Sequence, residues 1–269
     1  MLFRSVKVDK YKIDKYTFIT GATGGIGYEL ALVFAKNNHN LCLVARDIKK
    51  LREIKLHFEN TYKIKIIIYG VDLTLEKSII EIYQDIKDNN IIIENIINNA
   101  GYGSFGRFHE VDKDKDLTMI DLNIKSLTYI LKLFIPDLIE NGGGGIMNVA
   151  STAAFQSGPM MSVYYATKAY VLSLSGALRL ELSPYNINVS TLCPGPTDTN
   201  FQSRAKVEKA KSAKGFMMTA EKVAISAYKG FKKGKEIIIP GFQNKVLVYG
   251  SNLLPRKLIH KIILKVNKG

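Results

Sequence analysis

Cysteine, tryptophan and proline are scarce in this sequence of 269 residues. It has no tryptophan, seven prolines and two cysteines, Cys42 and Cys193, each of which stands inside an apolar run. Two thiols in a chain of this length do not make a disulfide framework, so we expect a reducing compartment. Both cysteines are expected to be small buried hydrophobic side chains.

Long apolar runs are absent too. No stretch long enough to span a bilayer is both apolar and free of charge, which argues against a membrane-spanning helix. The start of the chain, from Met1 to Tyr16, is basic and mixed, and it lacks the apolar core and small-residue cleavage site of a secretory signal. With 46% hydrophobic and 23% charged residues, the composition is globular. We therefore expect a soluble, cytoplasmic protein.

Acidic residues are scarce in the last quarter of the chain. Residues 201–269 hold 16 Lys and Arg against 3 Asp and Glu, so they carry 13 of the net charge of +14. Such a run is most often a solvated surface, which is the interpretation we favour. The alternative is an attractive field for an acidic partner: a phosphate-bearing thioester, an acidic carrier protein or an anionic membrane face. No nucleic-acid-binding motif accompanies the charge, so we do not expect nucleic acid as a partner.

Short apolar runs alternate with helix-period segments from about residue 15 to 240. The expected strands are 17–20, 41–45, 64–69, 95–98, 145–150, 188–192 and 236–239, and the helices between them are 29–37, 48–61, 75–87, 115–140 and 162–183. Strands that are apolar throughout are typical of sheets covered on both faces, and alternating βα units imply parallel strands. The sequence therefore predicts an α/β fold: a doubly wound (Rossmann) parallel sheet of about seven strands with helices on both faces. We expect residues 1–269 to form a single domain.

Residues 195–219 show no clear period before a further expected helix at 220–232. A loop of that length in a compact domain is typical of a binding segment, so we predict a substrate lid. Its apolar side chains suggest an apolar substrate, although packing is their more frequent role; they are Phe201, Phe216, Met217 and Met218.

Residues 244–269 form a basic C-terminal extension. In its last part, 252–268, an apolar stripe runs beside a basic one. We expect this helix to pack on the core, with a subunit contact or a membrane-surface helix as alternatives.

A glycine-rich turn follows the first expected strand and opens the first helix. Gly21 lets the chain turn tightly, Gly25 removes a Cβ where a pyrophosphate would approach, and Gly27 allows close helix–strand contact. The helix start offers unpaired N–H groups and a positive dipole end to phosphates. This context predicts a dinucleotide site formed by Gly21, Thr23, Gly24, Gly25, Ile26 and Gly27.

The spacing TGxxxGxG resembles that of the short-chain dehydrogenase/reductase family, and the resemblance runs from about residue 15 to the end. Residues 98–101, Asn-Asn-Ala-Gly, resemble the family's NNAG element; Asp72 resembles its adenine-contacting aspartate; and residues 194–199 resemble its PG motif on the nicotinamide side. The resemblance implies further cofactor contacts from Asp72, Leu73, Asn99, Ala100, Gly101, Pro194, Gly195, Thr197 and Thr199. It also implies a homodimer or homotetramer, formed through the long helices 115–140 and 162–183.

The residues after the second expected strand bear on the choice of dinucleotide. An acid about 20 residues after the glycines would bind the ribose hydroxyl of NAD, and Ala45 stands at that position. Alanine leaves room for a 2′-phosphate, and the neighbouring Arg46 can pair with it. We therefore favour NADP(H) over NAD(H). Asp47 is the competing candidate, because a small shift in the alignment would bring this acid to the ribose.

Tyr164 and Lys168 stand four residues apart on one expected helix and so share a face. Together with Ser151 and Asn123 they resemble the family's catalytic set. A phenol has an ordinary pKa of about 10, which a nearby ammonium and the positive nicotinamide are expected to lower. The resemblance implies that Tyr164 transfers the proton, Lys168 holds the nicotinamide ribose, Ser151 bonds the substrate oxygen, and Asn123 holds a water that links Lys168 to solvent. The adjacent Tyr165 has no lysine four residues on and is expected to pack elsewhere.

The resemblance therefore implies an NADP(H)-dependent oxidoreductase that interconverts a small-molecule carbonyl and its alcohol. A specific alternative is a 3-oxoacyl-thioester reductase acting on acyl-carrier or coenzyme A substrates. In that case the basic residues 201–269 would attract the acidic carrier or the phosphates of coenzyme A. Alternatives of another class are a non-catalytic dinucleotide-binding protein and a membrane-surface protein. Membrane contact is not favoured, and we assign no metal ligand.

Overall fold

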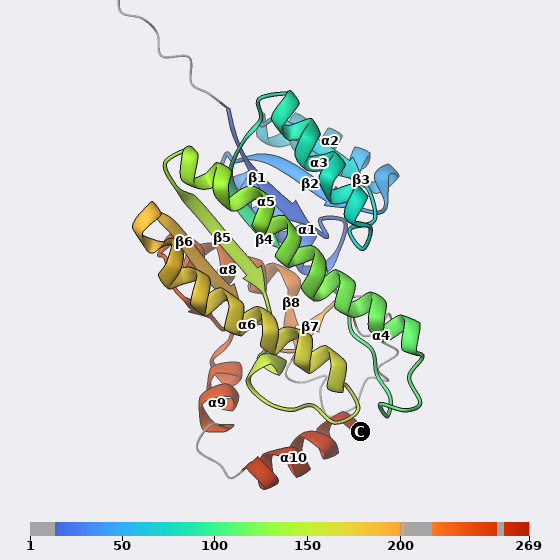
Figure 1. The fold of residues 1–269 in the computed structure, drawn as a ribbon. Helices are drawn as coiled ribbons and strands as arrows, with labels where there is room; N and C mark the ends of the chain where they lie inside the picture. Colours follow the sequence, from blue (N-terminus) through green and yellow to red (C-terminus); the bar gives the residue numbers. More distant parts are fainter. Residues whose placement is uncertain (1–13, 200, 202–216, 252–255, 269) are drawn as a thin grey trace, which may run out of the picture.

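The computed structural model describes residues 14–199, 201, 217–251 and 256–268 (Figure 1). Seven parallel strands form one sheet in the order β3-β2-β1-β4-β5-β6-β9. They are β1 (Lys15–Thr20), β2 (Asn40–Ala45), β3 (Ile66–Gly70), β4 (Ile92–Asn98), β5 (Gly144–Val149), β6 (Ile187–Leu192) and β9 (Ile237–Ile238). The predicted doubly wound parallel sheet is confirmed. Its strand order reverses between β1 and β4, the place where ligands bind in such sheets.

Helices cover both faces of the sheet (Figure 1). On one face lie α1 (Gly25–Lys36), α2 (Ile48–Tyr62) and α8 (Ala220–Lys232), and on the other α3 (Glu76–Asp88), α5 (Leu127–Glu140) and α6 (Ser162–Leu182). Strand β2 shows why the apolar runs are continuous: Cys42 and Val44 join the core under α3 and α5, whereas Leu41 and Leu43 join the core under α1 and α2. Side chains alternate between the faces along a strand, so a strand buried on both sides has no polar face.

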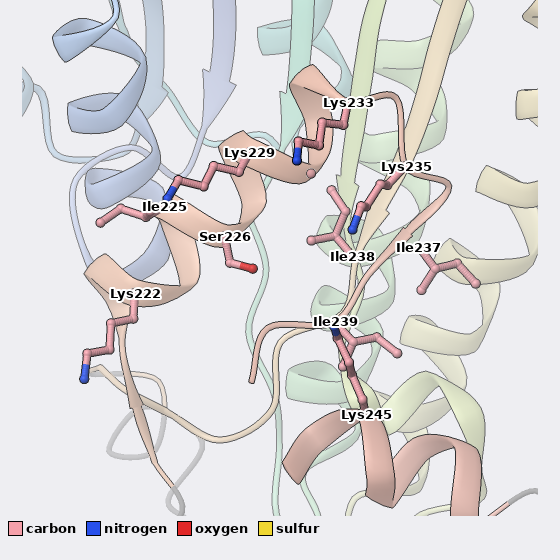
Figure 2. A pocket seen from close by; sticks show the side chains of 11 residues that line it. Lys222, Ile225, Ser226, Lys229, Lys233, Lys235, Ile237, Ile238, Ile239 and Lys245 are labelled. Atoms are coloured by element: carbon pink, nitrogen blue, oxygen red, sulfur yellow. The ribbon is translucent and has the colours of Figure 1, made fainter. Parts of the chain in front are cut away.

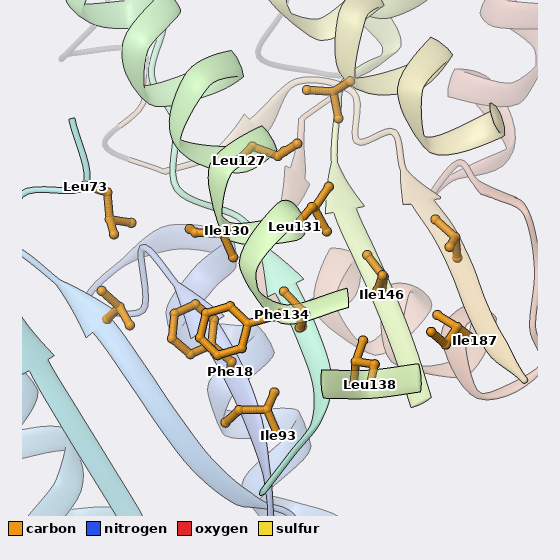
Figure 3. Close-up of a cluster of buried hydrophobic side chains, with 14 of the residues drawn as sticks. Phe18, Leu73, Ile93, Leu127, Ile130, Leu131, Phe134, Leu138, Ile146 and Ile187 are labelled. Atoms are coloured by element: carbon orange, nitrogen blue, oxygen red, sulfur yellow. The ribbon is translucent and has the colours of Figure 1, made fainter. Parts of the chain in front are cut away.

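The core beneath α5 shows this packing (Figure 3). Phe18 of β1 lies against Phe134 of α5, with 5.2 Å between the ring centroids. Both side chains are almost fully buried. Contacts of this kind fix α5 along the middle of the sheet, and with it the helical segment that precedes it.

The expected helix 115–140 is not one regular helix. It consists of α4 (Lys113–Ile120), a π-helical turn at Asp121–Ser126 and α5. The Ser126 hydroxyl donates to the backbone oxygens of Leu73, at 2.5 Å, and Asp121, at 2.7 Å. Such turns are rare and occur most often at functional sites. This one contains Asn123.

The C-terminal part differs in detail from the sequence expectation. Residues 242–251 form a helix, α9 (Phe242–Ser251), that was not expected. The last helix, α10, is Arg256–Lys268, and residues 252–255 of the expected helix lie outside the described residues. Asn267 of α10 donates to Pro159 O at 2.8 Å, and Ile263 is buried, so α10 packs on the loop before α6. Within the described residues, no helix is long and apolar enough to cross a membrane.

Most of the predicted lid, residues 200 and 202–216, lies outside the described residues, and so does Phe216. Its two ends form a small parallel pair, β7 (Thr197–Asp198) with β8 (Met218–Thr219).

Candidate active site

The glycine-rich turn leaves β1 at the point where the strand order reverses. Gly21 has φ +69° and donates its N–H to Val44 O at 2.8 Å, which turns the chain sharply. A Cβ on Gly27 would lie 2.1 Å from Gly21 O, so only glycine allows α1 to pack against the turn. Helix α1 starts at Gly25, and Gly24 before it offers no side-chain cap to its first N–H groups. A helix start of this kind suits a phosphate; Thr23 and Ile26 beside it are both half-buried.

A second segment locks this turn in place. The Thr20 hydroxyl accepts the backbone N–H groups of Asn99 at 3.0 Å and Ala100 at 2.9 Å. The Asn99 amide in turn donates to Thr20 O at 2.9 Å and Gly21 O at 3.3 Å. The turn after β1 and the NNAG segment after β4 are therefore one hydrogen-bonded unit. Thr20 was not among the predicted site residues, although its place at the end of β1 was a usable signal.

Arg46 and Asp47 follow β2 and have separate roles in the structure. Asp47 is the N-cap of α2, and its carboxylate accepts the backbone N–H of Lys50 at 3.0 Å. The Arg46 side chain is exposed and forms no ion pair within the described residues. Asp47, the alternative candidate for binding the ribose, therefore caps a helix.

Asp72 and Leu73 lie beyond β3. The Asp72 carboxylate accepts the backbone N–H of Thr74 at 2.9 Å and its hydroxyl at 2.8 Å, which makes a tight local turn. Leu73 is buried, and its carbonyl accepts the Ser126 hydroxyl at 2.5 Å. The predicted adenine side is therefore tied directly to the π-helical turn that carries Asn123.

The PG segment reaches both the phosphate loop and Ser151. Pro194 O accepts the Thr152 N–H at 2.9 Å and the Ser151 hydroxyl at 3.4 Å. At the other end of the segment, a Cβ on Gly25 would lie 3.0 Å from Thr199 Cγ2. Between them Thr197 donates its hydroxyl to Gly195 O at 2.9 Å. Segments that are far apart in the sequence thus face each other across the carboxyl edge of the sheet.

Ser151, Tyr164 and Lys168 come together at that edge. Ser151 follows β5, and Tyr164 and Lys168 share one face of α6. All three are buried. Lys168 Nζ lies 5.9 Å from the Tyr164 ring centroid, and the Ser151 side chain is close enough to Tyr164 to influence the pKa of its phenol. Lys168 donates to Val149 O at 2.9 Å, which fixes the ammonium under β5.

Burial shifts the protonation equilibria of both Tyr164 and Lys168. It raises the pKa of the Tyr164 phenol to about 12, and the Ser151 side chain acts in the opposite direction. Burial also lowers the pKa of Lys168 to about 8. Both groups are removed from water, and burial is the largest cause of each shift. That an ammonium and a bound nicotinamide together lower the phenol pKa stays a prediction.

Asn123 lies in the π-helical turn and is almost fully buried. Its Oδ1 accepts the Tyr102 N–H at 3.2 Å, and its Nδ2 donates to Tyr102 O and to the Thr167 hydroxyl, both at 3.0 Å. A Cβ on Gly101 would lie 2.8 Å from Asn123 Oδ1 and 3.4 Å from Lys168 Nζ. The amide therefore joins the NNAG segment to α6. Sequence reasoning missed Thr167 and Tyr102, which carry no motif of their own.

Apolar side chains surround the Tyr164 ring. Phe201 lies with its ring centroid 5.4 Å from that of Tyr164, and Met119 and Ala153 are buried beside them. Phe201 was predicted as a lid residue, and it is the described part of the lid that contacts the tyrosine. Contrary to the expectation that it packs elsewhere, Tyr165 lies in the same cluster, with its ring centroid 6.1 Å from that of Tyr164, and it also lies near Asn267 of α10.

Comparisons with known proteins agree with this geometry. Residues 15–210 match the family described as short chain dehydrogenase. An uncharacterized oxidoreductase of Staphylococcus epidermidis is 28% identical over 201 residues, which cover 72% of this chain and 86% of the relative. The very-long-chain 3-oxoacyl-CoA reductase of Rattus norvegicus is 27% identical over 264 residues, covering 96% of this chain and 81% of the relative.

A solved structure extends the likeness to three dimensions. The short-chain dehydrogenase from Sphingobium yanoikuyae in complex with NADPH is 29% identical, with a TM-score of 0.81 over 91% of this chain and 95% of that chain. With the matched family, the sheet order and the turn after β1, these likenesses have one explanation: the chain belongs to the short-chain dehydrogenase/reductase family of oxidoreductases.

Proposed function

We propose that this protein is an NADP(H)-dependent oxidoreductase that reduces a carbonyl to an alcohol, or runs the reverse reaction, with Tyr164 as proton donor and acceptor. The observation that carries the proposal is the burial of Ser151, Tyr164 and Lys168 together, with Lys168 Nζ 5.9 Å from the Tyr164 ring centroid, at the edge of the sheet where the glycine-rich turn opens.

The residues around the turn fit a dinucleotide phosphate. The first turn of α1 has no side-chain cap, and Gly25, with a positive φ, adds no side chain beside the N–H groups that would bind a diphosphate. The exposed Arg46 favours a 2′-phosphate, since Asp47 is held by α2. The NADPH complex of the Sphingobium yanoikuyae dehydrogenase supports the same choice of cofactor. A bound nicotinamide would supply or accept the hydride.

The chain's own residues would handle the oxygen and its proton. A phenol with a pKa of about 12 keeps its proton at neutral pH, so Tyr164 is in the form needed to protonate a carbonyl oxygen. The Ser151 hydroxyl would donate a hydrogen bond to the same oxygen and stabilise its developing charge. Lys168 would hold the nicotinamide ribose and favour the phenolate after proton transfer. Asn123 donates to the hydroxyl of Thr167, the residue before Lys168 on α6; its water-holding role stays a prediction.

The substitution Tyr164→Phe tests the proton donor. It removes only the hydroxyl, so turnover should fall at least about 1,000-fold while NADPH binding, measured by fluorescence titration, stays nearly unchanged. Tyr165→Phe is the matched control, because Tyr165 lies next in the chain but near Asn267 of α10. A Tyr164→Phe enzyme that keeps most of its activity would show that another group donates the proton.

A 3-oxoacyl thioester reductase is the second candidate. The alignment with the rat very-long-chain 3-oxoacyl-CoA reductase over 96% of this chain favours it, and so does the apolar surrounding of Tyr164. NADPH oxidation should be followed with a panel of simple ketones, 3-oxoacyl thioesters and steroids. Preference for the thioesters would select the second candidate. Tight NADPH binding without turnover of any class would instead favour a non-catalytic dinucleotide-binding protein.

A further inference from the structure

A pocket of about 370 Å³ lies at the edge of the sheet, between α8, β9 and the start of α9 (Figure 2). None of its lining residues belongs to the candidate active site. They include five lysines, Lys222, Lys229, Lys233, Lys235 and Lys245, which come from three different segments of the chain. The pocket is therefore a tertiary feature that the local sequence does not reveal.

All the charged side chains that line this pocket are positive. No acidic side chain lines it, and none of the five lysines forms an ion pair within the described residues. Glu221 adjoins Lys222 in the sequence but interacts with Glu29 of α1 instead. Several ammonium groups around one hollow repel one another, and their summed field attracts an anion into it. A charge-assisted contact is strongest where several donors converge.

The pocket also offers neutral donors and an apolar wall. The Ser226 side chain points into the space between α8 and β9 (Figure 2). In β9, the backbone oxygens of Glu236 and Ile238 accept N–H groups from Thr191 and Cys193 at the end of β6. Backbone groups alternate along a strand, so the N–H and C=O of Ile237 point the other way, toward the free edge of the sheet where the pocket lies. Ile225 is 37% exposed and forms part of the wall. A ligand with both charged and apolar parts fits this lining.

A second copy of the chain is a poor occupant. In a twofold contact the same patch meets itself, so the five lysines of each copy would face one another. Like charges brought together in this way are strongly unfavourable. A membrane surface is flat, whereas this site is concave and of the size of small-molecule sites.

We propose that this lysine pocket binds a soluble organic phosphate that carries two or more clustered phosphate groups and an apolar part. The phosphates lie among the lysine ammonium groups and Ser226, and the apolar part lies against Ile225 and Ile237. The site is separate from the glycine-rich turn, so the protein binds such a ligand together with its dinucleotide. This inference does not depend on the proposed reaction.

The test is calorimetric titration with inorganic pyrophosphate, on the full chain saturated with NADP⁺ so that the glycine-rich turn is blocked. The triple variant Lys229→Gln, Lys233→Gln, Lys235→Gln should weaken pyrophosphate binding at least about tenfold. Binding to the unmodified protein should also weaken as salt is added. The matched control carries the same loss of charge at three exposed lysines elsewhere, Lys113→Gln, Lys132→Gln, Lys261→Gln, and should bind like the unmodified chain.

Three results would overturn the proposal. One is equal affinity in the triple variant and the control. Another is pyrophosphate binding that disappears whenever NADP⁺ is present, which would place the anion at the glycine-rich turn. The last is lysine-dependent binding to vesicles of phosphatidylcholine and phosphatidylglycerol without binding of pyrophosphate. If the chain did not bind NADP⁺ at all, the proposed function would be wrong. The comparison of the two triple variants would still show whether the lysine pocket binds pyrophosphate.

Discussion

Lys168 illustrates at the scale of one residue how the candidate active site departs from the rest of the core. Its side chain is buried, no carboxylate pairs with it within the described residues, and its ammonium donates to the backbone oxygen of Val149. A buried cation without an anionic partner costs stability. We infer that Lys168 is kept for its chemistry and at the expense of folding.

Replacing Lys168 by methionine should therefore stabilise the protein while it abolishes turnover. Burial lowers the pKa of Lys168 from 10.5 to about 8 in the folded state, so the unfolded chain binds more protons between these values and the free energy of unfolding rises with pH there. The stabilisation by Lys168→Met should be largest below pH 8, up to about 3 kcal/mol, and should shrink between pH 8 and 10.5.

Urea unfolding at pH 7 and pH 10 measures this difference. Lys132→Met, at an exposed site on α5, is the control and should change stability little at either pH. A Lys168→Met protein that is less stable than the unmodified chain at pH 7 would contradict the prediction, since it would mean that the lysine contributes more through its hydrogen bond than it costs through burial.

Arg46 and Asp47 allow the cofactor choice to be tested at two neighbouring residues. Arg46→Ala should weaken NADPH binding by about 10- to 100-fold and leave NADH binding almost unchanged, because only NADPH carries the 2′-phosphate. Asp47→Asn keeps a good N-cap for α2 and removes the charge. The dissociation constants of NADPH and NADH, measured for both variants, test this cofactor preference. Equal losses for both cofactors in Arg46→Ala, or a selective loss of NADH in Asp47→Asn, would contradict the NADP assignment.

At the scale of elements, a polar contact joins three of them far from the active site. His39, in the turn between α1 and β2, hydrogen-bonds Glu94 of β4 at 3.2 Å and Tyr228 of α8 at 3.3 Å. The hydrogen bond from His39 is the main cause that holds the pKa of Glu94 below its ordinary value. A carboxylate whose pKa is lowered by folding adds stability above its unfolded pKa, and this stability is lost as pH falls through the folded pKa.

Glu94→Gln should therefore cost about 1 kcal/mol near neutral pH, or roughly 2 °C in melting temperature. The difference between the two proteins should disappear as the pH falls below about 4, because both then lack the charge. Thermal melts from pH 7 to pH 3 follow this change. Glu110→Gln on an exposed loop is the control. A difference that stays constant over the whole range would show that the effect of Glu94 is not electrostatic.

The last helix is attached beside α6 through an asparagine. Asn267 donates to Pro159 O and also lies near Tyr165, the neighbour of the proposed proton donor. Asn267→Ala should increase hydrogen exchange in residues 259–267 about fivefold, the effect of about 1 kcal/mol. Exchange in α8 should not change. Unaltered protection of α10 would show that buried apolar contacts such as Ile263 suffice to hold it.

At the scale of the whole molecule, the sheet was predictable and some of the helices were not. Strands such as β2 are buried on both faces, so their apolar runs identify them without any knowledge of the fold. The π-helical turn depends on a contact of Ser126 with Leu73, which lies far back in the sequence and which no local pattern contains. Helix α9 was missed because exposed and buried apolar residues mix along it: Phe242 and Leu247 are exposed, whereas Val248 is buried.

The candidate site also contains some groups that the sequence could predict and others that it could not. Candidate residues that would act through their side chains, such as Tyr164 and Lys168, could be named from their spacing and from the family resemblance. Groups that act through the backbone, such as Val149 O beneath Lys168, could not, because any residue type offers a carbonyl. The rise in the pKa of Tyr164 could not be predicted from the sequence, because burial is a property of the packed molecule.

The Thr20 hydroxyl has a consequence for how the protein is made. It accepts N–H groups from Asn99 and Ala100, which are synthesised much later than Thr20 itself. Although the glycine-rich turn is complete in sequence at Gly27, its final shape requires β4 to be in place beside β1. We therefore expect that the growing chain cannot yet bind a dinucleotide when the turn leaves the ribosome. That ability arises only after Ala100 has emerged and docked.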